Sequence, residues 1–282
     1  AYSLAPILYN IGIIFGAVYF VNYFGTAGLA IGVVGGAFLH MLVQIPAFFG
    51  VGYRFQLVLD FKDKNLIKIV KLMVPVTMGL ALVQINLLVD NIVGSFLAEG
   101  SIAIINFATN LISLPVGLIG ISFAVSVYPI LSYAVCQKKD DVFVTNFNST
   151  FRMLLYLLMP AMVFCLLFRA HIVRLILGAG LFSVDNTVWT ARTFGYLSLG
   201  LVAQGLIPFL TRTFYAFSDT KTPLKVVVAA ALVNLAGNLF FTQYLDFQVA
   251  GLAMAATVAS FVNLFLLLIL IKEKLPIIKL NT

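Results

Sequence analysis

Residues 100–137 read GSIAIINFATNLISLPVGLIGISFAVSVYPILSYAVCQ and contain no Asp, Glu, Lys or Arg. A helix that crosses a bilayer needs about 20 mostly apolar residues, so this stretch is longer than one span. Backbone groups in hydrocarbon must hydrogen-bond within their own segment, and the stretch therefore predicts one long membrane helix. The other long charge-free windows cover residues 1–53, 72–89, 153–168, 193–211, 226–245 and 247–271.

The composition excludes a water-soluble protein. Of the 282 residues, 62% are apolar and 10% are charged, whereas a soluble domain carries roughly 25% charged residues. The same numbers exclude a disordered chain, which would have low hydrophobicity. The two cysteines, Cys136 and Cys165, lack a metal-binding spacing. We therefore expect neither a disulfide framework nor a zinc site, and we expect Cys165 to be a small core residue.

The charge-free windows predict an all-α, polytopic membrane protein with about eight transmembrane helices. The window 1–53 divides at Asn22-Tyr23-Phe24-Gly25-Thr26, so it predicts a helical hairpin. We expect helices at residues 4–22, 27–49, 68–97, 101–134, 150–168, 187–214, 223–243 and 248–271.

Positive charge is distributed unevenly about these helices. Of the 17 Lys and Arg residues, all but Arg169, Arg174 and Arg192 fall on one side of the predicted membrane. Because cytoplasmic loops are enriched in Lys and Arg, we expect a multi-pass membrane protein with both ends of this chain in the cytoplasm. The net charge of +7 then reflects topology rather than nucleic-acid binding. The chain begins at Ala1 with neither an initiator Met nor a signal-peptide pattern, which predicts a fragment of a longer protein.

Two of the predicted hairpins resemble each other in sequence. Ala27-Gly28-Leu29-Ala30 opens the second predicted helix, and Ala250-Gly251-Leu252-Ala253 opens the eighth. Both hairpins start and end on the same side, so the repeat is parallel, as in transporters built from two lobes. The expected parts are the last two helices of an N-terminal lobe (1–52), a cytoplasmic basic linker (53–71), a C-terminal six-helix lobe (72–274), and a cytoplasmic tail or truncated linker (275–282).

Asp90 is the one acid deep inside a predicted span. An ionisable group at that depth is costly, and it usually faces the bundle interior or a water-filled cavity. Asn234 and Asn238 share one face of the seventh helix, and Thr257 lies inside the eighth. Carboxylate, amide and hydroxyl oxygens suit a hard cation, so these four residues are a candidate Na⁺ site. Proton coupling through Asp90 and hydrogen bonding between helices are the alternatives. No other cofactor is expected.

A polar stripe runs along the helix expected at residues 101–134. Asn106, Asn110 and Ser113 follow the spacing i, i+4, i+7 and therefore share one face. We expect these three residues to bind substrate in a polar cavity, with hydrogen bonding between helices as the alternative. Pro115 and Gly117 are expected to bend or hinge the same helix.

No pattern of residues indicates catalysis. The histidines are His40, which has no acidic neighbour in sequence and is expected to pack, and His171, which lies in an outer loop. Without a visible base, nucleophile or metal set, the chain is predicted not to be an enzyme. Gly32, Gly35 and Gly36 are expected to allow close contact between helices.

Several short motifs identify a family, and the block that starts at Phe214 is the most specific. The motifs are Pro6…Asn10, Gly28-Leu29-Ala30…Gln44-Ile45-Pro46, Lys71-Leu72-Met73-Val74-Pro75, Gly100-Ser101-Ile102…Ala108…Leu114-Pro115-Val116-Gly117, Pro129-Ile130-Leu131-Ser132 and Phe214-Tyr215-Ala216…Asp219-Thr220-Lys221-Thr222-Pro223-Leu224-Lys225. Through these motifs most of the chain resembles the MurJ/MviN family of lipid II flippases, within the superfamily of multidrug, oligosaccharidyl-lipid and polysaccharide (MOP) exporters.

The resemblance implies a two-lobe transporter of the bacterial cytoplasmic (inner) membrane, of which this chain supplies about the fifth to the twelfth helix. It implies outward transport of an undecaprenyl-pyrophosphate-linked peptidoglycan precursor by alternating access, and it implies that the set around Asp90 is a cation site in the second lobe. The family has a cavity arginine in an Ala-x-Arg-Leu stretch, where this sequence has Ala108-Thr109-Asn110-Leu111. An amide can bond a phosphate oxygen but supplies no charge, and a charge-assisted bond is about twice as strong.

Three other functions stay open on the sequence. One is a cation-coupled multidrug or polysaccharide-lipid exporter of the same superfamily. The others, from different classes, are an intramembrane transferase and a fragment that does not transport. The expected partners are a lipid-linked substrate and membrane lipids, with no nucleic acid, and the oligomeric state is left open.

Overall fold

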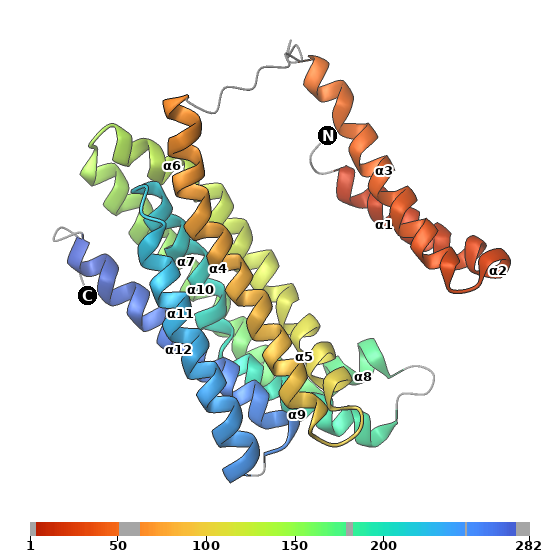
Figure 1. Cartoon of the computed structure of the whole chain (residues 1–282). Helices are drawn as coiled ribbons and strands as arrows, with labels where there is room; N and C mark the ends of the chain where they lie inside the picture. Colours follow the sequence, from red (N-terminus) through yellow and green to blue (C-terminus); the bar gives the residue numbers. More distant parts are fainter. Residues whose placement is uncertain (1–3, 51–62, 179–182, 246, 275–282) are drawn as a thin grey trace. The chain divides into compact units, whose positions relative to one another are not determined.

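The computed structural model describes residues 4–50, 63–178, 183–245 and 247–274, which are helices and their connections (Figure 1). By their internal contacts, the residues group into two units, Ala1–Lys62 and Asp63–Thr282. We describe each unit by itself.

The first unit is a helical hairpin. Helix α1 (Ala5–Phe15) continues through a π-helical turn, η1 (Gly16–Phe20), into the short α2 (Val21–Phe24), and α3 (Ala27–Gly50) packs back along it. The two arms are therefore the two spans that the window 1–53 predicts. The turn between them contains Gly25, whose φ of +57° is rarely adopted by residues with a Cβ.

Glycine allows the two arms of this hairpin to touch at their backbones. A Cβ added at Gly16 would lie 2.5 Å from the Cα of Gly32, and Gly12 faces Gly36 in the same way. The prediction of close packing is therefore confirmed for Gly32 and Gly36. Gly35 makes no such contact within the hairpin, because no described atom lies within 4 Å of a Cβ there, and for this residue close packing stays a prediction. Gly35 lies one residue from the contact face, and each helical residue turns by about 100°.

The second unit is a bundle of long antiparallel helices (Figure 1). A 36-residue span formed by α5, η2 and α6 confirms the single long helix predicted from residues 100–137. The elements of the unit are α4 (Lys64–Ser95), α5 (Ser101–Pro115), η2 (Val116–Ile121), α6 (Ser122–Cys136), α7 (Asp140–Leu167), α8 (Arg169–Leu177), α9 (Val184–Leu199), α10 (Leu201–Ala216), α11 (Lys221–Leu239), η3 (Phe240–Tyr244) and α12 (Val249–Lys274).

The number of spans agrees with the predicted fold class. Within the described residues, seven helices are long and apolar enough to cross a membrane, and an eighth is obtained if α9 and α10 count as one span bent by 47°. The chain is therefore a multi-pass membrane protein with an all-α fold.

Three boundaries differ from the prediction. Helix α7 begins at Asp140 rather than near residue 150, because Asp140 and Asp141 in its first turn favour a helix N-terminus. The sixth predicted helix breaks between α9 and α10. The short α8 (Arg169–Leu177) was not predicted, because Arg169, His171 and Arg174 interrupt its apolar residues and made the stretch resemble a loop.

Some predicted boundaries fall on residues that are not described. In the predicted linker, residues 53–62 lie outside the described residues, and residues from Lys64 onward form the first turns of α4. The predicted tail, residues 275–282, also lies outside them.

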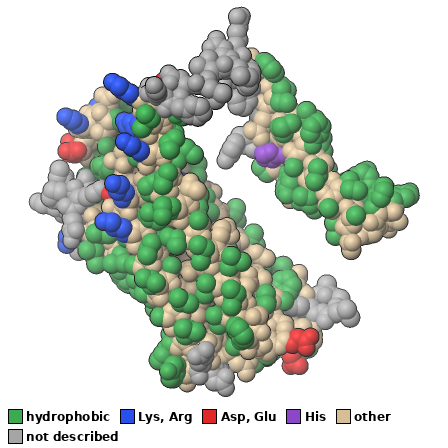
Figure 2. Space-filling view, in the orientation of Figure 1, with side chains coloured by type: hydrophobic (Ala, Val, Ile, Leu, Met, Phe, Trp, Pro, Cys, Tyr) green, Lys and Arg blue, Asp and Glu red, His purple; other side chains and the backbone are tan. Residues whose placement is uncertain are grey.

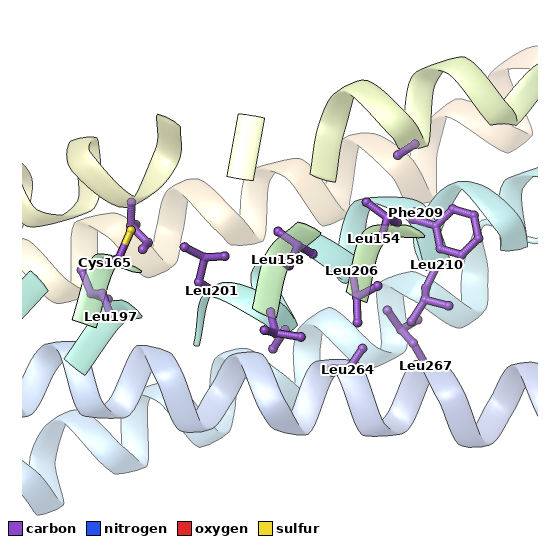
Figure 3. Packing of buried hydrophobic residues seen from close by; sticks show 14 of the residues in the cluster. Leu154, Leu158, Cys165, Leu197, Leu201, Leu206, Phe209, Leu210, Leu264 and Leu267 are labelled. Atoms are coloured by element: carbon purple, nitrogen blue, oxygen red, sulfur yellow. The ribbon is translucent and has the colours of Figure 1, made fainter. Parts of the chain in front are cut away.

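Helix α10 occupies the centre of the second unit, where α6, α7 and α12 pack against it. Its side chains Leu206, Phe209 and Leu210 are buried, and they lie among Leu154 of α7 and Leu267 of α12 (Figure 3). Cys165 is a buried member of the same cluster, with a free thiol, which confirms the prediction for this residue (Figure 3).

The outer surface of this unit suits a hydrocarbon solvent. Large apolar side chains stay exposed along the spans, for example Leu80, Leu118 and Tyr156, and Figure 2 shows them over most of the visible face. Figure 2 shows Lys and Arg side chains gathered at one end of the bundle, which we call the lysine-rich end. The alternating helices bring to it Lys64, Lys68, Lys138, Lys139, Lys221 and Lys272.

The hairpins that carry the sequence repeat also share a structural feature. In each, the first arm contains a π-helical turn near its end, η1 before the short α2 in one and η3 in the other. In each, the glycine of the Ala-Gly-Leu-Ala motif packs on the backbone of that turn: Gly28 against Phe20, and Gly251 against Phe241. The similarity of the two hairpins therefore extends from the sequence to local geometry.

Candidate functional site

A buried polar cluster joins α4 to α11. Asn238 donates a hydrogen bond from Nδ2 to Oδ1 of Asp90 at 2.6 Å, across 148 residues of sequence. Asn238 is fully buried, and Asp90 is partly buried. The structure therefore brings together two of the four residues predicted for a cation site.

Asn234 completes this cluster and extends it to α12. It lies one helical turn before Asn238, and its side-chain oxygen accepts from Nδ2 of Asn238 at 3.2 Å. With the Asn234 amide turned by 180°, its nitrogen donates to Asp90 and its oxygen accepts from the Ala256 backbone N–H, both at 3.2 Å. In that orientation the side chain links three helices. We refer to Asp90, Asn234 and Asn238 as the polar triad.

One oxygen of the polar triad has no partner. The side-chain oxygen of Asn238 is buried and accepts no hydrogen bond from the described residues. A buried acceptor without a partner costs about 1–3 kcal/mol. This oxygen, the Asp90 carboxylate and the Asn234 carbonyl are all hard donors of the type that a cation such as Na⁺ prefers. The residues present therefore fit a small hard cation.

The backbone next to the polar triad departs from α-helical geometry. Helix α11 ends at Leu239, directly after Asn238, and the π-helical turn η3 follows. The Thr242 hydroxyl donates to the carbonyl oxygen of Asn238 at 2.5 Å, across that transition. Single π-helical turns inside helices occur frequently at functional sites.

Thr257, the fourth residue predicted for the cation site, has a different partner. Its hydroxyl donates to the Tyr196 carbonyl oxygen at 2.8 Å. That carbonyl lies at the break between α9 and α10, where the Gly200 N–H turns back to Leu197. No hydrogen bond in the described structure joins Thr257 to the polar triad, although its neighbour Ala256 faces Asn234.

The predicted stripe lies on the exposed side of α5. Asn106, Asn110 and Ser113 are exposed, whereas Ala108 and Leu111 between them are buried in the bundle. The Ser113 hydroxyl donates to the Asn110 backbone carbonyl at 2.6 Å. The two amide side chains form no hydrogen bond with another described residue. In hydrocarbon such amides would be costly, so this face is expected to meet water or polar groups.

The helix that carries the stripe changes its geometry where the sequence predicted a bend. Helix α5 ends at Pro115, and the π-helical turn η2 begins at Val116. The Pro115 ring lacks an N–H and crowds the preceding turn, which accounts for the local change.

Other groups singled out in the sequence have structural roles. His40 is partly buried, meets the ring edge of Tyr9, and its Nδ1 lies 3.2 Å from the Gln44 amide nitrogen. In the described part of the chain, no three His, Cys, Asp or Glu side chains group as metal ligands would.

The site also contains backbone groups that the sequence did not indicate. The Ala256 N–H and the Tyr196 carbonyl both face site residues. Backbone groups carry no sequence signal, and we did not predict a break near Tyr196, although Gly200 could have indicated one.

The family follows from comparison with known proteins. A family model described as lipid II flippase MurJ matches residues 1–282. The chain belongs to the MurJ family of lipid II flippases. A probable lipid II flippase MurJ of Vibrio cholerae is 32% identical over 240 residues, which cover 85% of this chain and 45% of the relative. The corresponding Haemophilus influenzae protein is 30% identical over 273 residues, covering 94% of this chain and 53% of that relative.

Solved structures agree with this family. A lipid II flippase MurJ in an inward closed conformation matches with a TM-score of 0.74 and 26% identity, over 95% of this chain and 55% of that chain. A MATE structure in complex with MaL6 matches with a TM-score of 0.79 over 98% of this chain and 63% of that chain, but at 14% identity it shows a shared fold alone. The chain spans about half the length of the curated MurJ relatives it matches.

Proposed function

We propose that this chain forms the central part of an inner-membrane flippase that moves lipid II, the undecaprenyl-pyrophosphate-linked peptidoglycan precursor, by alternating access. Membership of the MurJ family, over the whole chain, is the observation that carries this proposal. A family named for moving a lipid, rather than for making or breaking a bond, also supports a transporter rather than an enzyme. We further propose that both ends of this chain are cytoplasmic, because Lys and Arg concentrate on that side.

The exposed stripe on α5 would line the path of the polar headgroup. Asn106 and Asn110 present two amides whose donors are free to bond phosphate or sugar oxygens. Ser113 contributes less, because its hydroxyl proton is used within the helix. The hydrocarbon tail of the substrate would stay in the bilayer, since only the headgroup needs a polar route.

A flip assay tests this function. The protein is reconstituted into vesicles with lipid II that carries a fluorophore on its headgroup, and a membrane-impermeant reductant is added outside. Transport predicts that nearly all the fluorophore is bleached, whereas a protein that does not transport leaves the inner-leaflet share intact. The double variant Asn106→Leu/Asn110→Leu should slow the bleaching of that inner share.

We propose that Na⁺ binds at the polar triad and couples to transport. The partnerless Asn238 oxygen and the neighbouring carboxylate support this assignment. A bound cation would supply positive charge that neutralises Asp90 inside the membrane, where an unpaired carboxylate is costly. Thr257 would act indirectly, by holding the Tyr196 carbonyl at the helix break.

A proton on Asp90 is the alternative coupling ion. It would remove the negative charge without using the free Asn238 oxygen, and that oxygen is the reason for preferring Na⁺. Stabilisation of the protein by NaCl but not by choline chloride, at constant pH, separates the two ions.

A drug exporter of the same superfamily is the second candidate function. The uncharged Asn110 favours it, because an amide holds a pyrophosphate less strongly than a guanidinium does. Binding of an aromatic cation, displaced by Na⁺ and unaffected by lipid II, would support the exporter over the flippase.

A further inference from the structure

A pocket with two arginines lies at the end of the second unit opposite the lysine-rich end. It has a volume of about 570 Å³, is open on one side, and is lined by the end of α7, the start of α8 and one side of α9. Its walls are mostly apolar, including Leu166, Val188 and Leu199, and its cations are Arg169 and Arg192. All of its lining residues belong to one unit. It lies on elements that carry neither the polar triad nor the stripe.

Neighbouring described residues hold both guanidinium groups in place. Arg169 donates from Nη1 to the Leu166 carbonyl oxygen at 3.0 Å. The Arg192 guanidinium lies 5.6 Å from the ring centre of Trp189 and 5.9 Å from that of Phe247. Within the described parts of the chain, neither arginine forms an ion pair. Toward the described residues, each guanidinium therefore keeps N–H donors that can bond an anion.

Gly195 provides the room for one of these arginines. It is buried on α9, and a Cβ there would lie 2.9 Å from Cδ of Arg169. The Arg169 side chain therefore runs along the bare backbone of α9 toward the pocket. A larger residue at position 195 would displace the guanidinium without changing its charge.

The surroundings of the pocket place it at the level of lipid headgroups. Arg169 comes directly after the span α7, and Arg192 lies eight residues into α9, about 12 Å along it. Trp189, the single tryptophan of the chain, lies beside Arg192, and tryptophan is enriched at membrane interfaces. Helix α8 buries Val173 but exposes Leu175 and Ile176 beside its cations, as interfacial helices do.

We propose that the Arg169/Arg192 pocket binds the phosphate of an anionic phospholipid from the leaflet opposite the lysine-rich end, with an acyl chain against its apolar wall. Guanidinium groups suit phosphate oxygens because they present paired N–H donors in one plane. Basic pockets between membrane helices bind anionic headgroups in this way. The lipid is a resident ligand, distinct from the transported substrate, so the proposal stands apart from the flippase function.

Trp189 provides a direct probe of this site. The full chain is placed in phosphatidylcholine nanodiscs with increasing fractions of phosphatidylglycerol whose acyl chains carry bromine, which quenches tryptophan on contact. Brominated phosphatidylcholine is titrated in parallel. We expect half-maximal quenching at about a tenfold lower fraction of the anionic lipid, the preference that one charge-assisted contact provides. Equal quenching by the two lipids would overturn the proposal.

Variants locate the preference in the pocket. In Arg169→Gln/Arg192→Gln, the two lipids should reach half-maximal quenching at the same fraction. Gly195→Ala should reduce the ratio between the two fractions, although both charges remain. Arg174→Gln removes a charge from the same short helix but outside this pocket, so it should leave the ratio unchanged. An equal loss in Arg174→Gln would mean general surface attraction and would contradict the proposal. If the double variant does not fold, Gly195→Ala alone decides.

Inorganic phosphate distinguishes the source of the anion. Phosphate at millimolar concentration should not change quenching by the brominated anionic lipid, because a lipid also gains apolar contact with the wall. Loss of the lipid preference at that concentration would assign the pocket to free phosphate and overturn the lipid proposal.

Discussion

At the scale of single residues, the polar triad shows why a few polar groups determine a membrane site. Polar groups buried in an apolar bundle are stable only when they meet one another. The sequence offers few such groups, so the contact between Asp90 and Asn238 was predictable from type and depth alone. The same reasoning grouped Thr257 with these residues. Its hydroxyl instead donates to the backbone carbonyl of Tyr196, and a backbone group has no sequence signal.

Asp90→Asn should remove stabilisation by Na⁺. For the unchanged chain, Na⁺ at about 100 times its dissociation constant adds about 2.7 kcal/mol to the free energy of unfolding, because the ion binds only the folded state. The variant keeps the shape of the side chain but lacks the charge. The measurement is thermal unfolding in detergent with NaCl or with choline chloride.

Thr257→Val serves as the matched control for that experiment. It leaves the Tyr196 carbonyl without its partner and should lower stability by about 1–3 kcal/mol in either salt. The shift caused by Na⁺ should persist, because the Thr257 hydroxyl bonds to the Tyr196 carbonyl and not to the polar triad. A Na⁺ shift that survives in Asp90→Asn would refute the assignment of the cation site.

Asn110→Arg should tighten binding of a pyrophosphate lipid. Adding a charge-assisted bond at the exposed stripe is expected to lower the dissociation constant about tenfold. Ser113→Ala should change it little, because that hydroxyl already donates within the helix. Binding of labelled lipid II in detergent measures both variants. Unchanged affinity in Asn110→Arg would show that the headgroup does not reach the stripe.

At the scale of elements, the long span α5–η2–α6 comes close to α10 where Gly120 lies against the backbone of Gly205. A Cβ at Gly120 would lie 2.5 Å from the Gly205 carbonyl oxygen. The sequence predicted the length of this span and its disturbance at Pro115. It did not predict the crossing point, because a glycine in an apolar helix gives no sign of its partner.

Gly120→Ala should destabilise the bundle. The added methyl group meets backbone rather than a flexible side chain, and overpacking of this kind costs about 1–3 kcal/mol. Gly117→Ala, in the same π-helical turn, has no atom within 4 Å of the new Cβ and should be neutral or slightly stabilising. The melting temperatures of the Gly120→Ala and Gly117→Ala variants, measured by thermal unfolding, test this prediction. Equal losses would place the crossing elsewhere.

The break between α9 and α10 and the short α8 mark the limit of prediction for elements. By hydropathy alone, the stretch that contains the break fits a single span, and the stretch that contains α8 fits a loop. The break depends on a tertiary hydrogen bond from Thr257, and α8 depends on packing of Val173 into the bundle. Neither contact is visible in a local window of sequence.

At the scale of the whole molecule, charge defines two ends of the bundle. Lysines occupy one end, and Arg169, Arg174 and Arg192 lie toward the other end. The segregation was readable from the sequence, since it needs only the order of spans and loops. The arginine pocket was not, because it depends on how α7, α8 and α9 pack.

Introduced cysteines should separate these two ends. In a chain with Cys136 and Cys165 replaced by alanine, Asp140→Cys lies at the start of α7 and Asp185→Cys in the first turn of α9. If the lysine-rich end is cytoplasmic, as we propose from the distribution of Lys and Arg, an impermeant thiol reagent added to intact cells should label position 185 only. Labelling of position 140 instead would reverse the orientation, and labelling of both would contradict the predicted number of spans.

Water access to the stripe on α5 tests the account most directly. In the same cysteine-free chain, Asn110→Cys is compared with Leu118→Cys, which is 75% exposed on an apolar part of the same span. If the stripe lines a hydrated path for a headgroup, a charged thiol reagent should react with position 110 and not with position 118. Equal protection of both positions by the membrane would contradict a polar passage along this helix.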